Sequence, residues 1–247
     1  MILNPHRFGT AGVAGDPSFA NVYGLWHGDG ADLSTVFTDS SSHLWADTKL
    51  GSPVVSTTFS KFGGASIRFP GGAQVILAPS TNWSWMHQLN GKWTWELFAS
   101  FDSFAAERTL FSTSNGSTGD AGIYCGITPS RQIDFQMYRS INSTFVINNA
   151  SGIVIPNDTA FHHIAIVCDL SLATGNLLEF VDGTLVATFN KTADAPTSNP
   201  ATSSLKIGGY STVGSYVGYM DEIRITKDVA RYTAAFVPPT AAFPNSA

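Results

Sequence analysis

Short apolar runs that alternate with polar residues recur along most of the chain. Most of these runs have a period of two and end at Gly, Pro, Asn or Ser, which is typical of strands with one buried and one solvated face. The pattern predicts an all-β protein with no helix longer than a turn or two. The candidate strands span residues 22–27, 54–59, 65–69, 74–78, 93–101, 108–112, 122–128, 132–139, 143–147, 162–169, 177–181, 184–189, 205–208 and 219–226.

The strongest local signal is the stretch LLEFVDGTLVATF at residues 177–189. Asp182 and Gly183 separate two alternating runs, and this dipeptide supplies the positive φ angles of a tight hairpin turn. Many antiparallel strands of this length predict two packed sheets, because a single sheet would expose one face and two long edges. We therefore expect an antiparallel β-sandwich.

The sandwich is expected to span residues 21–230, with a different kind of segment on each side. Residues 1–20 are rich in Gly and Ala and predict an N-terminal docking arm that is ordered by its contacts. Residues 231–247 place aromatic side chains among three prolines, which predicts an extended tail. The aromatics would anchor this tail on the sandwich or on a neighbouring molecule. Deleting residues 232–247 is expected to leave the sandwich folded and to weaken assembly.

Composition agrees with a β-protein and excludes several partners. Of the 247 residues only 13% are charged, and Gly and turn-forming polar residues are abundant. The net charge is −5 and Lys and Arg do not cluster, so nucleic acid is not expected as a partner. No run approaches the roughly 18 apolar residues of a membrane span, and residues 1–15 lack the apolar region of a signal peptide. We expect synthesis in a cytosol and no membrane insertion.

The cysteines and the paired histidines favour structural roles. Cys125 and Cys168 each lie in an apolar run without a CxxC partner, and we favour buried free thiols over a disulfide because a cytosol is reducing. His162 and His163 point to opposite faces of one strand, so they do not bind one metal together. We favour a role at the strand entrance over a role as general base.

Seven stretches, in this order, resemble the laminin-G-like branch of the concanavalin A-like lectin/glucanase superfamily, in the version found in bacteriophage virion proteins. This resemblance implies a jelly-roll β-sandwich at the virion surface, on the head or the tail, made in the host cytoplasm and bound to other virion proteins. The chain departs from the usual phage form at Gly28, Leu33 and Phe161, which affects the loop around Asp29 more than the sandwich. The stretches are HGDGADLSTVFTDSSSH (27–43), SKFGGASIRFPGG (60–72), WTWELFASFD (93–102), FHHIAIVCD (161–169), FVDGTLVATF (180–189), LKIGGY (205–210) and GYMDEIRITKDVARYTAAFVPPTAAFP (218–244).

Three aspartates are candidate calcium ligands. Asp29 and Asp39 lie in an early polar loop, and Asp221 begins the last strand on its expected core-facing side. Laminin-G-like domains often place a calcium ion near a sheet rim, and carboxylate oxygens suit this cation. The alternative, which we favour for Asp221, is a carboxylate that accepts backbone N–H groups. Glu222 and Arg224 are expected on the opposite, solvated face of the same strand.

Aromatic side chains are candidates for carbohydrate binding. Trp83 and Trp85 share one parity in the stretch NWSWMHQLNGKW and are surrounded by polar residues. They predict either a ligand or subunit contact, or a cap on the sandwich. Tyr210 and Tyr216, in a Gly/Ser-rich stretch before the last strand, form a second candidate group.

The sequence does not favour an enzyme. Glucanases of the superfamily need two Glu residues a few positions apart on one strand face, and Glu96, Glu107, Glu179 and Glu222 are far apart in sequence. No G-x-S-x-G nucleophile motif is present.

We therefore expect a non-enzymatic virion structural protein, a homo-oligomer that binds host-surface or mucus glycans weakly and through many copies. The first alternative is a capsid decoration protein without a ligand. A glycan hydrolase comes last.

Overall fold

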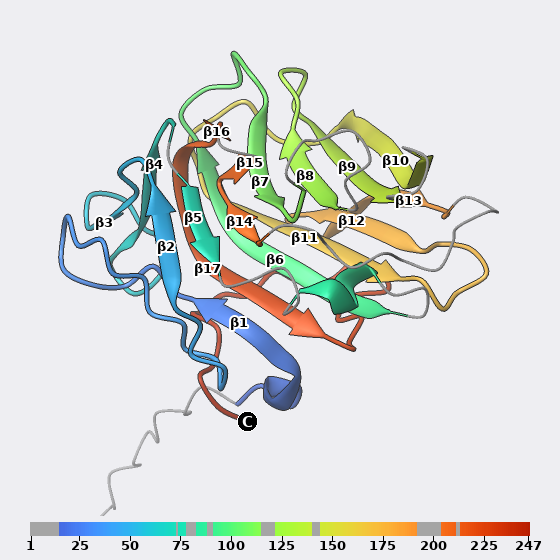
Figure 1. Cartoon of the computed structure of the whole chain (residues 1–247), viewed down its shortest axis with the longest axis horizontal. Helices are drawn as coiled ribbons and strands as arrows, with labels where there is room; N and C mark the ends of the chain where they lie inside the picture. Colours follow the sequence, from blue (N-terminus) through green and yellow to red (C-terminus); the bar gives the residue numbers. More distant parts are fainter. Residues whose placement is uncertain are drawn as a thin grey trace, which may run out of the picture.

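The computed structural model describes residues 15–72, 74–77, 83–87, 91–114, 122–139, 144–191, 204–210 and 213–247. Almost all of the regular secondary structure in these residues is β-strand (Figure 1). Helical structure within them is confined to the short turns η1 (Phe19–Asn21) and η3 (Ser84–His87). None of these residues forms a helix long and apolar enough to cross a membrane. The strands are β1 (Val22–Trp26), β2 (Asp47–Leu50), β3 (Val54–Ser56), β4 (Ser66–Pro70), β5 (Gln74–Leu77), β6 (Lys92–Phe101), β7 (Arg108–Ser112), β8 (Ile123–Ile127), β9 (Gln132–Arg139), β10 (Thr144–Ile153), β11 (His162–Asp169), β12 (Leu177–Val181), β13 (Thr184–Phe189), β14 (Lys206–Ile207), β15 (Gly209–Tyr210), β16 (Val213–Gly214) and β17 (Val217–Lys227).

Two antiparallel sheets form the sandwich. One sheet has the order β13-β12-β11-β6-β17-β4-β3, and β1 joins it by pairing with β17. The other has the order β10-β9-β8-β7-β14-β5-β2. Strand β17 joins three neighbours, because it pairs with β6 on one side and with β4 and then β1 on the other. The predicted all-β, jelly-roll sandwich is confirmed.

The alternating pattern located the strands well. Each of the fourteen candidate runs overlaps a strand, and the hairpin between β12 and β13 turns at Asp182 and Gly183, with φ angles of 48° and 76°. Strands β2, β15 and β16 were not predicted. Strand β2 is mostly exposed and has no apolar alternation, so only its pairing with β5 defines it.

The core between the sheets is rich in aromatic residues. Trp95 of β6 stacks on Phe111 of β7 with ring centroids 4.0 Å apart, which joins the two sheets directly. Both residues are fully buried, and such pairs stabilise a core beyond the area they bury. Cys125 and Cys168 are buried and free, as the sequence predicts.

The C-terminal tail covers the outer face of the eight-stranded sheet. Tyr232 and Phe236 stack on each other and pack on Phe180 of β12, while Phe243 packs near Phe98 of β6. The C-terminal end of the chain lies beside η1 (Figure 1). The tail therefore anchors on its own sandwich, which was one of the two expected arrangements. The predicted docking arm, residues 1–20, falls mostly outside the described residues.

The hairpin turn between β12 and β13 also receives this tail. The Phe236 N–H donates to the carbonyl oxygen of Gly183 at 2.9 Å. A Cβ on Gly183 would overlap the Phe236 carbonyl, and the positive φ of this residue disfavours any side chain. Gly183 thus makes the turn and also leaves room for the tail.

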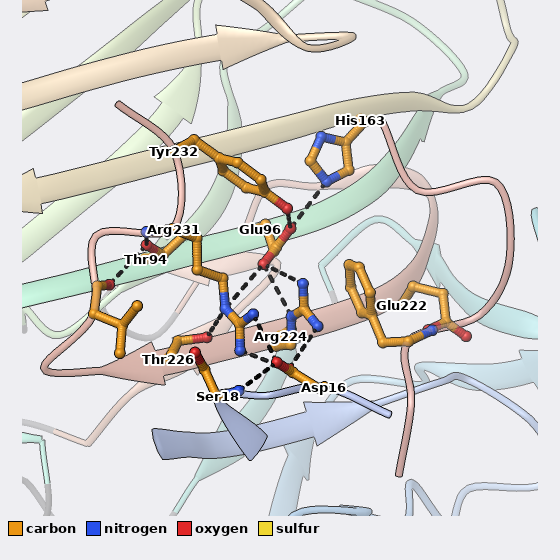
Figure 2. Close-up of polar contacts among 12 residues, drawn as sticks. Asp16, Ser18, Thr94, Glu96, His163, Glu222, Arg224, Thr226, Arg231 and Tyr232 are labelled. Atoms are coloured by element: carbon orange, nitrogen blue, oxygen red, sulfur yellow. Dashed lines mark hydrogen bonds and ion pairs between the residues drawn. The ribbon is translucent and has the colours of Figure 1, made fainter. Parts of the chain in front are cut away.

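A network of buried charges lies under the tail (Figure 2). Arg224 of β17 lies opposite Glu96 of β6 and donates to Glu96 Oε1 from Nε at 2.9 Å, with Nη2 at 2.8 Å. Asp16 accepts from Arg224 at 3.0 Å and from Arg231 at 2.7 Å. The Tyr232 hydroxyl donates to the other Glu96 oxygen at 2.7 Å. The network therefore ties residues from both ends of the described chain to the centre of the sheet.

This packing corrects two expectations for the last strand. Glu222 and Arg224 do not face solvent, since their exposed fractions are 0% and 5%. The cause is the tail, which covers the face that alternation had marked as solvated. Asp221 is not on the core-facing side either, because a bulge at Glu222, where φ is 50°, shifts the register and places Asp221 opposite Phe98.

The network holds Glu96 in its charged form. Burial alone would raise the pKa of Glu96, but the Arg224 charge, His163 and Arg231 lower it to about 2. A folded-state pKa below the usual 4.5 stabilises the fold above about pH 4.5, and this stabilisation is lost as the pH falls towards 2.

Replacing Glu96 tests this electrostatic contribution. Glu96→Gln removes one of the two carboxylates that bind the buried Arg224 and leaves Asp16 as the other, so we expect the free energy of unfolding at pH 7 to fall by about 3 kcal/mol. Urea titrations should show that the difference from wild type shrinks between pH 4.5 and 3. Asp228→Asn, at an exposed position after β17, is the control. If Glu96→Gln lowers the free energy of unfolding by the same amount at pH 4.5 and at pH 3, the result would contradict this account.

Truncating the tail anchor tests the cover over the sheet. Phe243 is 4% exposed and Val237, in the same tail, is 83% exposed. Phe243→Ala should lower the free energy of unfolding by about 3 kcal/mol, because a buried ring is lost. Val237→Ala should change it by less than about 0.5 kcal/mol. Similar thermal midpoints for the two variants would show that the tail is not part of the folded unit. That result would agree with the expectation from the sequence that the sandwich stays folded without residues 232–247.

Candidate functional site

A pocket of about 300 Å³ lies on the face of the seven-stranded sheet that points away from the core. Strands β7, β8 and β9 form its floor, and β15 lies beside β7 (Figure 1). The described lining residues are Glu107, Thr109, Tyr124, Asp134, Gln136, Tyr210 and Ser215.

Strand alternation determines which side chains reach this pocket. On β9, Ile133 and Phe135 are fully buried in the core, so the intervening Asp134 and the next polar residue, Gln136, point to the other face. On β8, Tyr124 reaches the pocket between buried neighbours in the same way. The pocket therefore follows from three strands whose inward positions are apolar and whose outward positions carry polar or aromatic groups.

A chain of hydroxyl groups runs through the pocket and ends on a carboxylate. The Ser215 hydroxyl donates to Thr109 Oγ1 at 2.7 Å, and Thr109 is hydrogen-bonded to Tyr124. The Tyr124 hydroxyl in turn donates to Glu107 Oε1. Burial and the Glu107 charge raise the pKa of Tyr124 far above its ordinary value, which keeps its proton in place.

A second carboxylate and a second tyrosine complete the pocket. The Gln136 amide nitrogen lies 3.2 Å and 3.0 Å from the two Asp134 oxygens. Burial raises the pKa of Asp134; the Gln136 hydrogen bond opposes this shift, and the Glu107 charge adds to it. Tyr210 packs edge to face against Tyr124 with ring centroids 5.2 Å apart. The pocket thus offers aromatic surface together with carboxylate acceptors.

Gly126 makes room for Tyr124. A Cβ at this position would overlap the Tyr124 hydroxyl, so only glycine leaves the ring where it reaches Glu107. This close approach explains a glycine inside β8, where the residue otherwise weakens a strand.

Of the predicted carbohydrate-binding aromatics, only Tyr210 lines this pocket. Trp83 and Trp85 are 0% and 7% exposed and pack edge to face against Tyr23, so neither presents a face to a ligand. Their burial agrees with the alternative that they cap the sandwich. Tyr216 is fully buried, and its hydroxyl donates to the Ser100 carbonyl oxygen at 2.9 Å. The core encloses all three side chains, so none of them presents a ring face at the surface.

The three candidate calcium ligands have different surroundings. The buried Asp39 accepts backbone N–H groups from three residues, each at 2.9 Å. Asp221 accepts from the N–H groups of Lys61 and Phe62 at 2.7 Å and 3.1 Å, which is the alternative favoured from the sequence. Asp29 is exposed. The part of the chain that the structure describes contains no group of three or more His, Cys, Asp or Glu side chains arranged to hold a metal ion.

The paired histidines occupy structural positions at the start of β11. His163 is fully buried, with Nε2 3.2 Å from Glu96 Oε2. His162 lies between Asp182 and Asp158, with ring nitrogens 2.6 Å and 3.0 Å from their carboxylates. Neither histidine lines the pocket, in agreement with the role favoured from the sequence.

Glu179 of β12 is a buried carboxyl in the core. It is 0% exposed, and neither of its oxygens has a hydrogen-bond partner in the described part of the molecule. Burial, reinforced by the Asp134 charge, raises the pKa of Glu179 to about 9. Glu179 is therefore protonated at neutral pH, and ionising it would place an unpaired charge in the core.

The pH dependence of stability tests this assignment. A folded-state pKa above the usual 4.5 gives stability that is present below pH 4.5 and is lost as the pH rises through about 9. Relative to Glu179→Gln, wild-type protein should lose about 1.4 kcal/mol of unfolding free energy per pH unit across that range. Denaturant titrations at pH 5.5 and 7.5 measure this difference. Parallel pH profiles for the two proteins would contradict the protonated state.

The fold and the site together define a class: a two-sheet antiparallel β-sandwich with a polar, aromatic pocket on one open face. Residues 70–231 match the family model of the Concanavalin A-like lectin/glucanases superfamily. The chain therefore belongs to this superfamily. A comparison with curated proteins found no sequence match.

Solved structures share the fold at low sequence identity. Domain 4 of a GH43 extracellular arabinanase from Geobacillus stearothermophilus, in complex with arabinotriose, is 12% identical with a TM-score of 0.59, over 84% of this chain and 93% of its own. The binding domain of botulinum neurotoxin DC, in complex with rat synaptotagmin II, is 12% identical with a TM-score of 0.59, over 86% of this chain and 49% of its own. The Ruminococcus gnavus IT-sialidase CBM40, bound to α2,3-sialyllactose, is 15% identical with a TM-score of 0.51, over 66% of this chain and 90% of its own.

Proposed function

We propose that this protein binds carbohydrate in the pocket on the seven-stranded sheet. One observation carries the proposal: this face holds two tyrosines and two carboxylates around a cavity of about 300 Å³, whereas the tail covers the outer face of the other sheet. Aromatic rings stack on sugar rings, and carboxylates accept hydrogen bonds from sugar hydroxyls. The volume is at the lower limit of small-molecule sites and suits one or two sugar units.

The comparisons support a carbohydrate ligand. Two of the similar structures are complexes with arabinotriose and with sialyllactose. Their sandwich architecture is shared with this chain, although the sequence identities are only 12% and 15%.

We propose further that the protein acts without catalysis at the surface of a bacteriophage virion. The family resemblance of the last strand and tail motivates this location, and many copies would offset a weak single site. Other virion proteins and further copies of the chain would then be its partners. A decoration protein without a ligand is the remaining possibility within this location, and the binding experiment below separates the two.

Glycoside hydrolysis is a second candidate, favoured by one observation. Glu107 and Asp134 line the same pocket, and Asp134 has a raised pKa, as the acid of a glycosidase does. Two features favour binding instead. The Glu107 carboxylate is engaged by Tyr124, and Gln136 holds Asp134. Release of reducing sugar from any glycan that binds would support hydrolysis.

A glycan array with and without calcium tests the proposal. Wild-type protein should bind a subset of glycans, and Tyr210→Ala should weaken this binding by about tenfold or more, because a stacking surface is lost. Gly126→Ala should do the same by displacing Tyr124. Val237→Ala, in the tail, is the control and should bind like wild type. Folded protein that binds no glycan under either condition would reject carbohydrate binding and favour the decoration role.

A further inference from the structure

We propose that the pocket accepts neutral or amine-bearing sugars and rejects sugars that carry a carboxylate or sulfate group. This inference rests on the proposed carbohydrate binding and adds the class of ligand. It follows from the direction of the hydrogen bonds and from the charges of the described lining residues.

Four of the five side chains in the described lining that can donate a hydrogen bond are bonded within the pocket, and the fifth is Tyr210. Ser215 donates to Thr109, Thr109 is bonded to Tyr124, and Tyr124 donates to Glu107. The amide nitrogen of Gln136 faces both oxygens of Asp134. A ligand therefore meets an environment in which acceptors predominate, and acceptors are satisfied by the hydroxyl or ammonium donors of a sugar.

The charge of the pocket also favours ligands that carry no negative charge. Its described lining holds two carboxylates, Glu107 and Asp134, and no Lys, Arg or His. The neighbouring Arg108 is 8% exposed, and its guanidinium donates to the carbonyl oxygens of Ser103 at 2.7 Å and Ser215 at 3.1 Å. Both of these hydrogen bonds go to backbone carbonyl oxygens, one of them that of the lining residue Ser215, and Arg108 itself is not among the described lining residues.

An acidic sugar would place a third negative charge beside these two carboxylates. Like charges within a partly desolvated site repel strongly, and this is the usual way in which a site excludes a ligand of the wrong charge. An amino sugar gains instead, because its ammonium group pairs with a carboxylate and lies over a tyrosine ring. The sialyllactose seen in the Ruminococcus gnavus module is accordingly not the ligand class expected for this chain.

The experiment compares matched glycans on wild-type and variant protein. One set of probes is lactose with its α2,3-sialylated and sulfated forms. A second set is chitosan and chitin oligomers, which differ in their content of free amines. Each glycan that binds in the array is also tested beside its acidic form. We expect the acidic form of each bound glycan to bind at least about tenfold more weakly than its uncharged form. The discrimination should decrease as salt is raised, because salt screens the repulsion.

Charge-removing variants assign the discrimination to the pocket. Glu107→Gln combined with Asp134→Asn should reduce the preference against acidic glycans by about tenfold. Asp134→Asn alone is the second variant, because Asp134 lies outside the hydroxyl chain and its replacement leaves that chain intact. Asp47→Asn, like Asp134→Asn, removes one negative charge from the seven-stranded sheet, but from β2 outside the pocket. It should leave the preference unchanged. Thermal melts establish that each variant is folded.

The outcomes separate this inference from the function on which it rests. Binding of acidic glycans that equals or exceeds that of their uncharged forms, and that Tyr210→Ala abolishes, would overturn the inference and leave the pocket function in place. An unchanged preference in both charge-removing variants would also overturn it. Absence of binding to every probe, or binding that Tyr210→Ala leaves intact, would overturn the proposed site and the inference together.

Discussion

The ion pair between Glu96 and Arg224 is the constraint on which the rest of the structure depends. The two residues lie opposite each other at the centre of the eight-stranded sheet, on its outer face. Charges in the interior must be paired and hydrogen-bonded, so this face has to be covered by groups that complete the network. Asp16, Arg231 and Tyr232 do so, and they fix both ends of the described chain against the sheet.

Covering one face leaves the other sheet to carry the candidate site. The tail packs on the outer face of the eight-stranded sheet around Phe98 and Phe180, and the pocket lies on the opposite side of the sandwich. The pocket is built on strands, which hold Tyr124 and Asp134 in fixed positions, and Gly126 leaves the space that Tyr124 needs. The two sheets thus have separate roles, one in closing the fold and one in presenting the candidate site.

Alternation in the sequence predicts the strands, the hairpin at Gly183 and the family fold, because these depend on local patterns. It predicts correctly that Arg224 points away from the core, but it does not show that the tail, which follows the same strand, folds back over that face. The bulge at Glu222 reverses the orientation of Asp221 and leaves no signal in the pattern. Trp83 illustrates the same limit, since polar neighbours in sequence made a buried indole resemble an exposed one. The pocket combines residues from β7, β8, β9 and β15 with Glu107 and Ser215 from two loops, so only their tertiary arrangement reveals it.

Hydrogen exchange in the presence of a bound glycan is the most direct test of the division between the two faces. Mass spectrometry would compare amide exchange with and without a neutral glycan taken from the array. The account predicts new protection in residues 107–112 and 124–136 and at residue 210, with exchange in residues 231–247 unchanged by the glycan. Protection by the glycan in residues 231–247, with none in the pocket strands, would contradict it.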